Sequence, residues 1–296
     1  MQNKIDIIEN YKSAGKPLIL DGAMGSLLQA KGLNMDPFLW YSKYNLDTPD
    51  IVKALHAEYI MAGADIITTN TFRTNPHALK LSNHRIDQSE MVKKSVLLAI
   101  DAREGKNIII AGSNAPAEDC YIRERTVAKY ELEYNHKMHI ELLWESGVDI
   151  IWNETQSHLD EIEIICKFCS DNYLPYSINF YFDDNLNLLS GERLIDAVEI
   201  ILGFDPLVIG FNCIKSNILR KFTVDYPLQE YWGFYLNCGN GNVTDEQLTC
   251  GITPEEYIDS IKSLLDKHPI FVGSCCGSSP SHTKAIRKYF DEIYRN

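Results

Sequence analysis

Basic residues are scarce in this sequence. Its 296 residues include 28 Lys and Arg against 41 Asp and Glu, which gives a formal net charge of -13. No run of basic residues offsets this negative charge, so the phosphate backbone of a nucleic acid would repel the chain. This charge balance excludes nucleic acid as an expected partner.

Long apolar segments are also missing. No stretch approaches the roughly 20 apolar residues that a membrane-spanning helix needs. The N-terminal segment MQNKIDIIENYKSAGKP lacks the apolar core and the small-residue cleavage site of a signal peptide. We therefore expect a cytoplasmic protein without a membrane partner. In that reducing compartment the eight cysteines, which are too sparse for a disulfide scaffold, would remain thiols.

The sequence does contain a regular alternation of apolar segments. Apolar residues make up 45% of the chain, which is enough for a sizeable core. Short runs rich in β-branched residues alternate with segments whose apolar residues follow helical spacing. The predicted strands are 18–21, 65–69, 107–111, 149–153, 175–180, 207–211, 232–236 and 270–273.

Several of these runs, such as NIIIAG and DIIWN, are apolar on both faces, which is typical of parallel strands covered on each side. Eight strand–helix repeats favour an α/β fold in which the sheet closes into a (β/α)8 TIM-type barrel, with residues 1–296 forming a single domain. The alternative is an open doubly wound sheet. We disfavour it because the first predicted strand is followed by DGAMG and not by the GxGxxG of dinucleotide-binding folds.

Cysteines follow two of the predicted strands. Active sites of (β/α)8 barrels form at the carboxyl ends of the strands, and Cys213, Cys275 and Cys276 come shortly after the sixth and eighth strands. Only the seventh strand separates those two, so the three thiols would converge if the barrel closes. Three thiolates with one open position are typical of a catalytic zinc site. The competing interpretation is a set of buried apolar thiols.

Five longer motifs follow one another along almost the whole chain. They are LILDGAMGSLL at 18–28, HAEYIMAGADIITTNTF at 56–72, GVDIIWNET at 147–155, IGFNC at 209–213 and GSCCG at 273–277. In this order the sequence resembles the homocysteine S-methyltransferase family. These zinc-dependent barrels also form the homocysteine-binding module of methionine synthases.

The resemblance implies roles for particular residues. Cys213, Cys275 and Cys276 would hold Zn2+ as the catalytic residues, and the thiol of homocysteine would enter the open position. Six further residues would bind or support the substrate. Glu154 would bind its amino group, backbone N–H groups near Gly22 and Thr71 would bind its carboxylate, Asp21 and Asn70 would support these contacts, and Asn212 would orient the zinc loop.

The function expected from this resemblance is zinc-dependent methyl transfer to homocysteine, which forms methionine. The donor would be S-methylmethionine or S-adenosylmethionine. The segment PAEDCY at 116–121 replaces a glycine- and acid-rich stretch that many family members carry, and such loops set specificity. A methyltransferase for another thiol or selenol therefore stays open. The sequence also leaves open a zinc component that passes its bound thiolate to a separate corrinoid protein. It leaves open, too, whether the chain forms a homo-oligomer.

Two other groups of metal-binding residue types have simpler interpretations. Cys166 and Cys169 form a CxxC, but the surrounding EIEIICKFCSD has the pattern of a helix, so we expect them to pack in the core. His136 and His139 share a helix face without a third ligand, and we expect a hydrogen-bonded pair.

Overall fold

Eight parallel strands form a closed sheet. The structure is a computed structural model that describes residues 4–82, 84–228, 231–240 and 249–294. The strand order is β1-β10-β7-β6-β5-β4-β3-β2, and a parallel bridge between Leu20 and Ile66 joins the two edges. The strands are β1 (Leu18–Ile19), β2 (Ile66–Thr68), β3 (Ile109–Asn114), β4 (Ile150–Gln156), β5 (Tyr176–Phe180), β6 (Val208–Asn212), β7 (Trp232–Leu236) and β10 (Phe271–Ser274).

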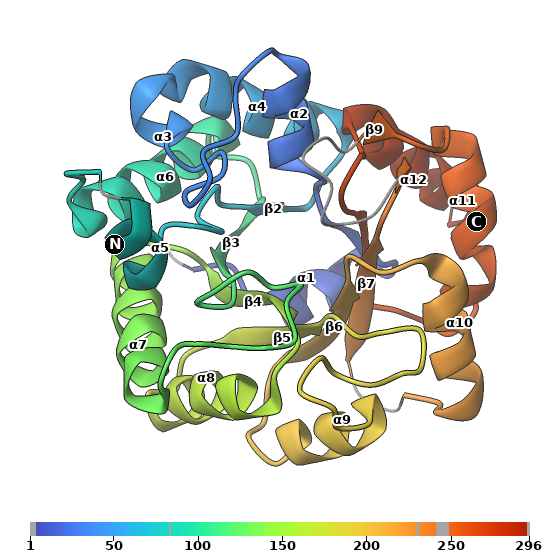
Figure 1. Cartoon of the computed structure of the whole chain (residues 1–296). Helices are drawn as coiled ribbons and strands as arrows, with labels where there is room; N and C mark the ends of the chain where they lie inside the picture. The colour runs from blue at the N-terminus through green and yellow to red at the C-terminus, as the bar shows by residue number, and fades with distance from the viewer. Residues whose placement is uncertain (1–3, 83, 229–230, 241–248, 295–296) are drawn as a thin grey trace.

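Helices surround this barrel (Figure 1). Between β7 and the next helix, a short antiparallel pair is formed by β8 (Gly239–Asn240) and β9 (Thr249–Cys250). The helices are α1 (Ile7–Ala14), α2 (Met24–Ala30), α3 (Tyr44–Asp47), α4 (Pro49–Ala62), α5 (Pro76–Ser82), α6 (Gln88–Arg103), α7 (Lys129–Ser146), α8 (Leu159–Asp171), α9 (Leu194–Leu202), α10 (Ser216–Asp225), α11 (Pro254–Leu265) and α12 (Pro280–Ile293).

The eight predicted strands are all present, and the (β/α)8 barrel is confirmed. The open doubly wound sheet is wrong, because β1 and β2 lie side by side. Asp21 N–H donates to Ile66 O at 2.9 Å, and Asp65 N–H donates to Ile19 O at 2.7 Å. These hydrogen bonds between β1 and β2 close the barrel. They bring the carboxyl ends of both strands to the same mouth of the barrel.

Aromatic side chains fill the barrel interior below that mouth. The ring of Trp152 contacts Phe271 edge-on with centroids 5.0 Å apart, and its Nε1–H donates to Tyr235 Oη at 3.2 Å. Gly233 leaves room for this layer, because a Cβ there would lie 2.3 Å from the ring of Phe271. Tyr235 also lines the cavity described below, so the aromatic layer supports that cavity from beneath.

A second apolar layer lies between the sheet and the surrounding helices. It includes Ile67, Ile110, Ile151, Ile178 and Ile209, which are at most 1% exposed. Apolar residues on both faces of each strand therefore have a core to enter, as expected for a parallel sheet. Within the described parts of the chain, no helix combines the length and apolar character of a membrane span.

Candidate active site

A cavity of about 350 Å³ opens at the carboxyl ends of the strands. Its wall is built from the ends of seven of the eight barrel strands or the segments that follow them, together with α2 and part of segment 35–42. Most of the residues selected from the sequence line it, namely Asp21, Gly22, Asn70, Glu154, Cys213, Cys275 and Cys276.

The three selected cysteines lie together in this cavity. Their Sγ atoms are all within 4.8 Å of one another. The distance is 2.6 Å between Cys213 and Cys275 and 3.9 Å between Cys275 and Cys276. Zinc–sulfur bonds of about 2.3 Å place the ligands of a tetrahedral zinc roughly 3.8 Å apart. The donor set therefore fits a zinc ion after small side-chain movements, and a fourth ligand can approach from the cavity.

Strand β7 fixes the backbone on both sides of the cysteines. Cys213 N–H donates to Tyr235 O at 3.2 Å, and Cys275 N–H donates to Leu236 O at 2.7 Å. Because β10 ends at Ser274, Cys275 and Cys276 have left the strand, in which neighbouring side chains would point to opposite faces. This departure allows both of them to face Cys213.

Asn212 connects two strained residues behind the cysteines. Thr155 and Cys213 adopt left-handed backbone conformations, with φ of 57° and 56°, and such conformations are costly for residues other than glycine. The Asn212 side chain accepts a hydrogen bond from Thr155 N–H at 3.0 Å and donates to Thr155 Oγ1 at 2.8 Å. It also donates to Cys213 Sγ at 3.3 Å. These buried bonds hold Cys213 in the conformation that reaches the other two thiols.

Replacing Asn212 by alanine should therefore loosen the cysteine site. Asn212→Ala leaves the Thr155 N–H without its acceptor, so we expect about 2 kcal/mol lower stability in denaturant unfolding. Zinc affinity, measured by competition with a chelator, should fall roughly 10-fold. Asn179→Ala is the control, because it removes a buried amide on β5 that does not line the cavity. Equal zinc affinities in the two variants would contradict the role of Asn212.

Glu154 faces the cavity from β4. Its carboxylate accepts hydrogen bonds from Ser113 Oγ and, at 3.2 Å, from Tyr235 Oη. Burial raises the pKa of Glu154 to about 7; the two hydroxyl groups oppose this rise, and negative charge at Cys276 adds to it. A cation bound here would favour the ionised form again, so the site suits a positively charged group.

A second carboxyl group lies on the same wall. Asp21 is 3% exposed and accepts hydrogen bonds from Thr68 N–H at 2.9 Å and Thr68 Oγ1 at 3.2 Å. Burial raises its pKa well above the usual range; the Thr68 N–H opposes this rise, and the charge of Glu154 adds to it. The two acids therefore make the cavity more attractive to a cation than either would alone.

Gly22 and Asn70 shape the wall next to Asp21. A Cβ at Gly22 would lie 2.5 Å from Ser278 Oγ, so glycine keeps this part of the backbone close to the neighbouring loop. Asn70 uses its amide to hold the segment before α4, since Nδ2 donates to Tyr41 O at 3.2 Å and to Asn45 Oδ1 at 3.0 Å. Its main contribution in this structure is thus to the shape of the cavity.

Thr71 lies behind the wall. Its N–H donates to Thr69 O at 2.8 Å, and its hydroxyl donates to Ser113 O at 2.7 Å. A local turn therefore uses the N–H of Thr71 itself, and the expectation that N–H groups near Thr71 bind a substrate carboxylate stays a prediction. Asn212 likewise does not line the cavity and acts from behind the cysteines.

Comparison with known proteins decides the family. A family model described as homocysteine S-methyltransferase matches residues 18–290. The chain belongs to the homocysteine S-methyltransferase family. The matched range includes every strand of the barrel and every residue of the site, and members of this family are S-methyltransferases.

Curated relatives in the homocysteine S-methyltransferase family match over nearly their full length. Homocysteine S-methyltransferase from Escherichia coli (strain K12) is 28% identical over 91% of this chain and 94% of its own length. Selenocysteine Se-methyltransferase from Brassica oleracea var. italica is 21% identical over 95% and 90%. The metallated crystal structure of homocysteine methyltransferase MmuM from Escherichia coli covers 96% of this chain and 100% of its own, with a TM-score of 0.80 at 22% identity. That likeness confirms the fold.

Sequence reasoning missed Tyr121, which lines the same cavity as the three cysteines in this homocysteine S-methyltransferase family member. Tyr121 lines the cavity, and its ring packs edge-on against Tyr181 at 5.1 Å. The pKa of the Cys276 thiol lies well below its usual range, because the neighbouring Cys213 and Cys275 thiols favour the thiolate more than burial opposes it. The sequence feature that could have pointed to Tyr121 is its position in PAEDCY, the segment that departs from the family pattern.

An aromatic and thioether wall was also missed. Trp40 and Phe72 are stacked with ring centroids 5.1 Å apart, and both line the cavity together with Met24 and Met35. Met24 and Phe72 lie in two of the motifs quoted above, but nothing in those motifs marks them as cavity residues, and Met35 and Trp40 lie outside all five motifs. Their gathering depends on the path of the loops around β1 and β2.

The remaining cysteine and histidine pairs are structural. Cys166 and Cys169 are buried in the core on α8, and burial raises the pKa of both thiols. His136 and His139 are buried and hydrogen-bonded to Asn114. Among the described residues, only Cys213, Cys275 and Cys276 form a His, Cys, Asp or Glu group with metal-binding spacing.

Proposed function

We propose that this protein transfers a methyl group from a small sulfonium compound to homocysteine, with a zinc ion held by Cys213, Cys275 and Cys276. The observation that carries the proposal is the meeting of these three sulfur atoms on the wall of the cavity. Three thiolates favour a borderline-soft metal such as zinc over magnesium or calcium. Zinc bound there would lower the pKa of a thiol in the open position and supply a thiolate nucleophile at neutral pH.

The chain's own residues would orient the homocysteine. Glu154 would bind the α-ammonium group, with Ser113 and Tyr235 holding its carboxylate in place. The backbone near Gly22 would receive the substrate carboxylate, and Asp21 would support this side of the cavity. Such contacts aim the sulfur at the methyl group, which is the main task in a transfer that needs no acid or base at the methyl carbon.

The character of the cavity supports a cationic donor of modest size. Its lining contains Asp21, Asp119 and Glu154, and no Lys, Arg or His is found among the described residues that line it. Aromatic rings at Trp40 and Phe72 suit a sulfonium group. A cavity of about 350 Å³ lies near the small end of ligand sites and must hold both substrates. We therefore propose S-methylmethionine as the donor, since S-adenosylmethionine adds a whole nucleoside.

The proposed transfer is a single in-line displacement. The sulfur of homocysteine forms a bond to the methyl carbon while the bond from that carbon to the donor sulfonium breaks. The bonding electron pair stays on the donor sulfur, which becomes a neutral thioether, and the thiol proton leaves to solvent. With S-methylmethionine as donor, both products are methionine.

The test is methionine formation by the purified protein loaded with zinc. Homocysteine is supplied with S-methylmethionine, S-adenosylmethionine or betaine, and we expect the highest kcat/KM with S-methylmethionine. Turnover only with S-adenosylmethionine or betaine would overturn the donor and keep the chemistry. Failure with every small donor, followed by turnover after a methylated corrinoid protein is added, would favour the component that serves a separate partner.

A selenol is the second candidate acceptor. Two relatives are named as selenocysteine methyltransferases, one from Brassica oleracea var. italica and one from Astragalus bisulcatus. Selenocysteine is shorter than homocysteine by one methylene, so its selenium and ammonium groups would not span the same distance between the cysteines and Glu154. Comparing kcat/KM for the two acceptors decides which one the cavity prefers.

A further inference from the structure

Asp119 lines the cavity from the loop between β3 and α7, residues 115–128. Its side chain is exposed, whereas Asp21 is buried and Glu154 is partly buried. The proposed contacts with homocysteine use Glu154 and Asp21 and leave Asp119 without a task. The cavity therefore contains a carboxylate that the acceptor does not require.

The Asp119 carboxylate is held by a local turn. Its Oδ1 accepts a hydrogen bond from Tyr121 N–H at 3.0 Å, and the backbone carbonyl of Asp119 accepts one from Ile122 N–H at 3.4 Å. Within the parts of the chain that the structure describes, no hydrogen-bond donor contacts Oδ2. One oxygen thus fixes the side chain against the loop, and the other can accept a hydrogen bond from a ligand in the cavity.

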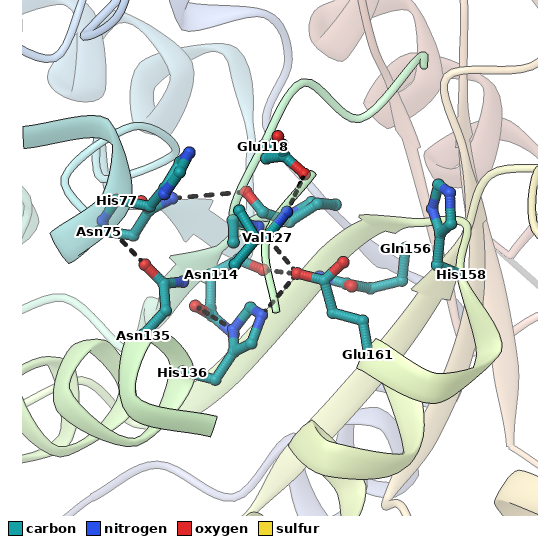
Figure 2. A network of polar contacts seen from close by, with 12 residues as sticks. Asn75, His77, Asn114, Glu118, Val127, Asn135, His136, Gln156, His158 and Glu161 are labelled. Atoms are coloured by element: carbon teal, nitrogen blue, oxygen red, sulfur yellow. Dashed lines mark hydrogen bonds and ion pairs between the residues drawn. The ribbon is translucent and has the colours of Figure 1, made fainter. Parts of the chain in front are cut away.

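The loop is anchored at the two residues just before Asp119. Ala117 N–H donates to Glu161 Oε1 of α8 at 2.8 Å. The Glu118 carboxylate accepts a hydrogen bond from Val127 N–H at 3.2 Å, and Figure 2 shows the Glu118 side chain pointing toward Val127. These bonds fix the loop to α8 and join its two ends, so little ordering of Asp119 is needed when a ligand binds.

Arg73 joins this loop to the aromatic wall of the cavity. Its side chain is buried and does not line the cavity. Arg73 Nη1 donates to Glu118 O at 2.7 Å, and Nε donates to Phe38 O at 3.1 Å. The guanidinium carbon also lies 5.4 Å from the centroid of the Trp40 ring. Because one guanidinium group contacts both segments, the loop that carries Asp119 runs beside the wall that contains Trp40.

The charge of Arg73 gives the Asp119 carboxylate a role in attracting a cationic donor. A guanidinium next to the ring of Trp40 disfavours a second positive charge at that ring, and the negative charge of Asp119 beside it offsets this repulsion. S-methylmethionine carries two positive groups, a sulfonium and an α-ammonium, separated by three carbon atoms. Aromatic rings suit the sulfonium, which has no hydrogen to donate, whereas a carboxylate suits the ammonium, which has three.

We propose that Asp119 binds the α-ammonium group of the methyl donor through Oδ2 and thereby favours donors that carry an amino group. This inference rests on the proposed function and adds a binding residue for the donor to it. Glu154 and Asp119 then bind the ammonium groups of the acceptor and the donor respectively. The segment PAEDCY, which departs from the family pattern and contains Asp119, receives a task in the selection of the donor.

The experiment compares two donors that differ only in the amino group, S-methylmethionine and 4-(dimethylsulfonio)butanoate. Zinc-loaded protein is assayed with saturating homocysteine at pH 7, where an α-amino group is mostly protonated. We expect Asp119→Asn to lower kcat/KM for S-methylmethionine on the order of 10-fold, because a hydrogen bond between two charged groups is lost. The change should lie in the KM of this donor, with kcat and the KM of homocysteine unchanged. The kcat/KM for 4-(dimethylsulfonio)butanoate should change much less.

Two controls accompany this comparison. Asparagine keeps an oxygen that can accept from Tyr121 N–H, so the loop should stay in place, and thermal unfolding checks that Asp119→Asn folds. Asp184→Asn is the matched control, because Asp184 is exposed after β5 at the same end of the barrel and does not line the cavity. It should leave kcat/KM for both donors unchanged.

The outcomes separate this inference from the proposed function. Wild-type protein that does not turn over S-methylmethionine would overturn the proposed donor, and this inference with it. Equal losses for both donors in Asp119→Asn, or the same loss in Asp184→Asn, would overturn only the present inference, because the carboxylate would then act through the overall charge of the protein. Wild-type protein that uses both donors equally well would also overturn it, because the amino group would then not be recognised.

Discussion

Cys276→Ala is expected to lose zinc and methyl transfer together. Wild-type protein should hold close to one zinc per chain, and the variant should hold little of it after dialysis, since two thiolates are too few to retain the ion. Methionine formation should fall by roughly three orders of magnitude or more, because the acceptor thiol is then mostly protonated at pH 7. Metal analysis and the methionine assay measure the two effects.

A neighbouring thiol provides the control for this prediction. Cys238 is buried beside the site, and its N–H donates to Cys276 O at 2.9 Å, but its sulfur is outside the group of three. Cys238→Ala keeps that backbone bond and should retain zinc and activity. Full zinc content in Cys276→Ala, or its loss in Cys238→Ala, would show that the ligands have been assigned wrongly.

Glu154→Gln is expected to weaken homocysteine binding roughly 100-fold at pH 8 and to change its dependence on pH. With a pKa of about 7 in the empty site, Glu154 is protonated at pH 6 and must release that proton to bind an ammonium group. The homocysteine thiol also releases a proton on binding as a thiolate. Below pH 7, the logarithm of the wild-type binding constant should therefore fall by about two for each pH unit. For the variant it should fall by about one for each pH unit.

Titration calorimetry in buffers of different ionisation enthalpy counts these protons directly. We expect nearly two released per homocysteine at pH 6 for the wild type and one for Glu154→Gln. Asp119→Asn removes another cavity carboxylate and should leave the count unchanged. The same count in the wild type and Glu154→Gln would mean that the ammonium group is bound elsewhere.

The barrel and the cysteine site were predictable from the sequence for one shared reason. Strands buried on both faces begin as apolar runs, such as IIIA at 108–111 in front of and within β3, and their carboxyl ends meet wherever a parallel sheet closes. Cys213 and Cys275 could therefore be brought together without knowledge of any loop. The two-residue strands β8 and β9 carry no such pattern and were not predicted.

Loop residues were less predictable because their positions depend on distant contacts. Thr71 follows a strand as expected, but a hydrogen bond to Thr69 two residues earlier turns its N–H away from the cavity. Tyr121 lines the cavity from a loop whose backbone near Ala117 is held by Glu161, which is 40 positions further along the chain than Tyr121. Neither contact leaves a local signal in the sequence.

The position of Cys213 and Cys275 on either side of β7 has a consequence for how the protein assembles. Cys213 and Cys275 are separated by 62 positions, and only the docking of β7 and β10 brings them together. A chain still being synthesised through this region cannot form the site. Since zinc would then bind the finished barrel far better than the unfolded chain, its supply should raise the melting temperature by mass action, and its withdrawal should expose the last strands first.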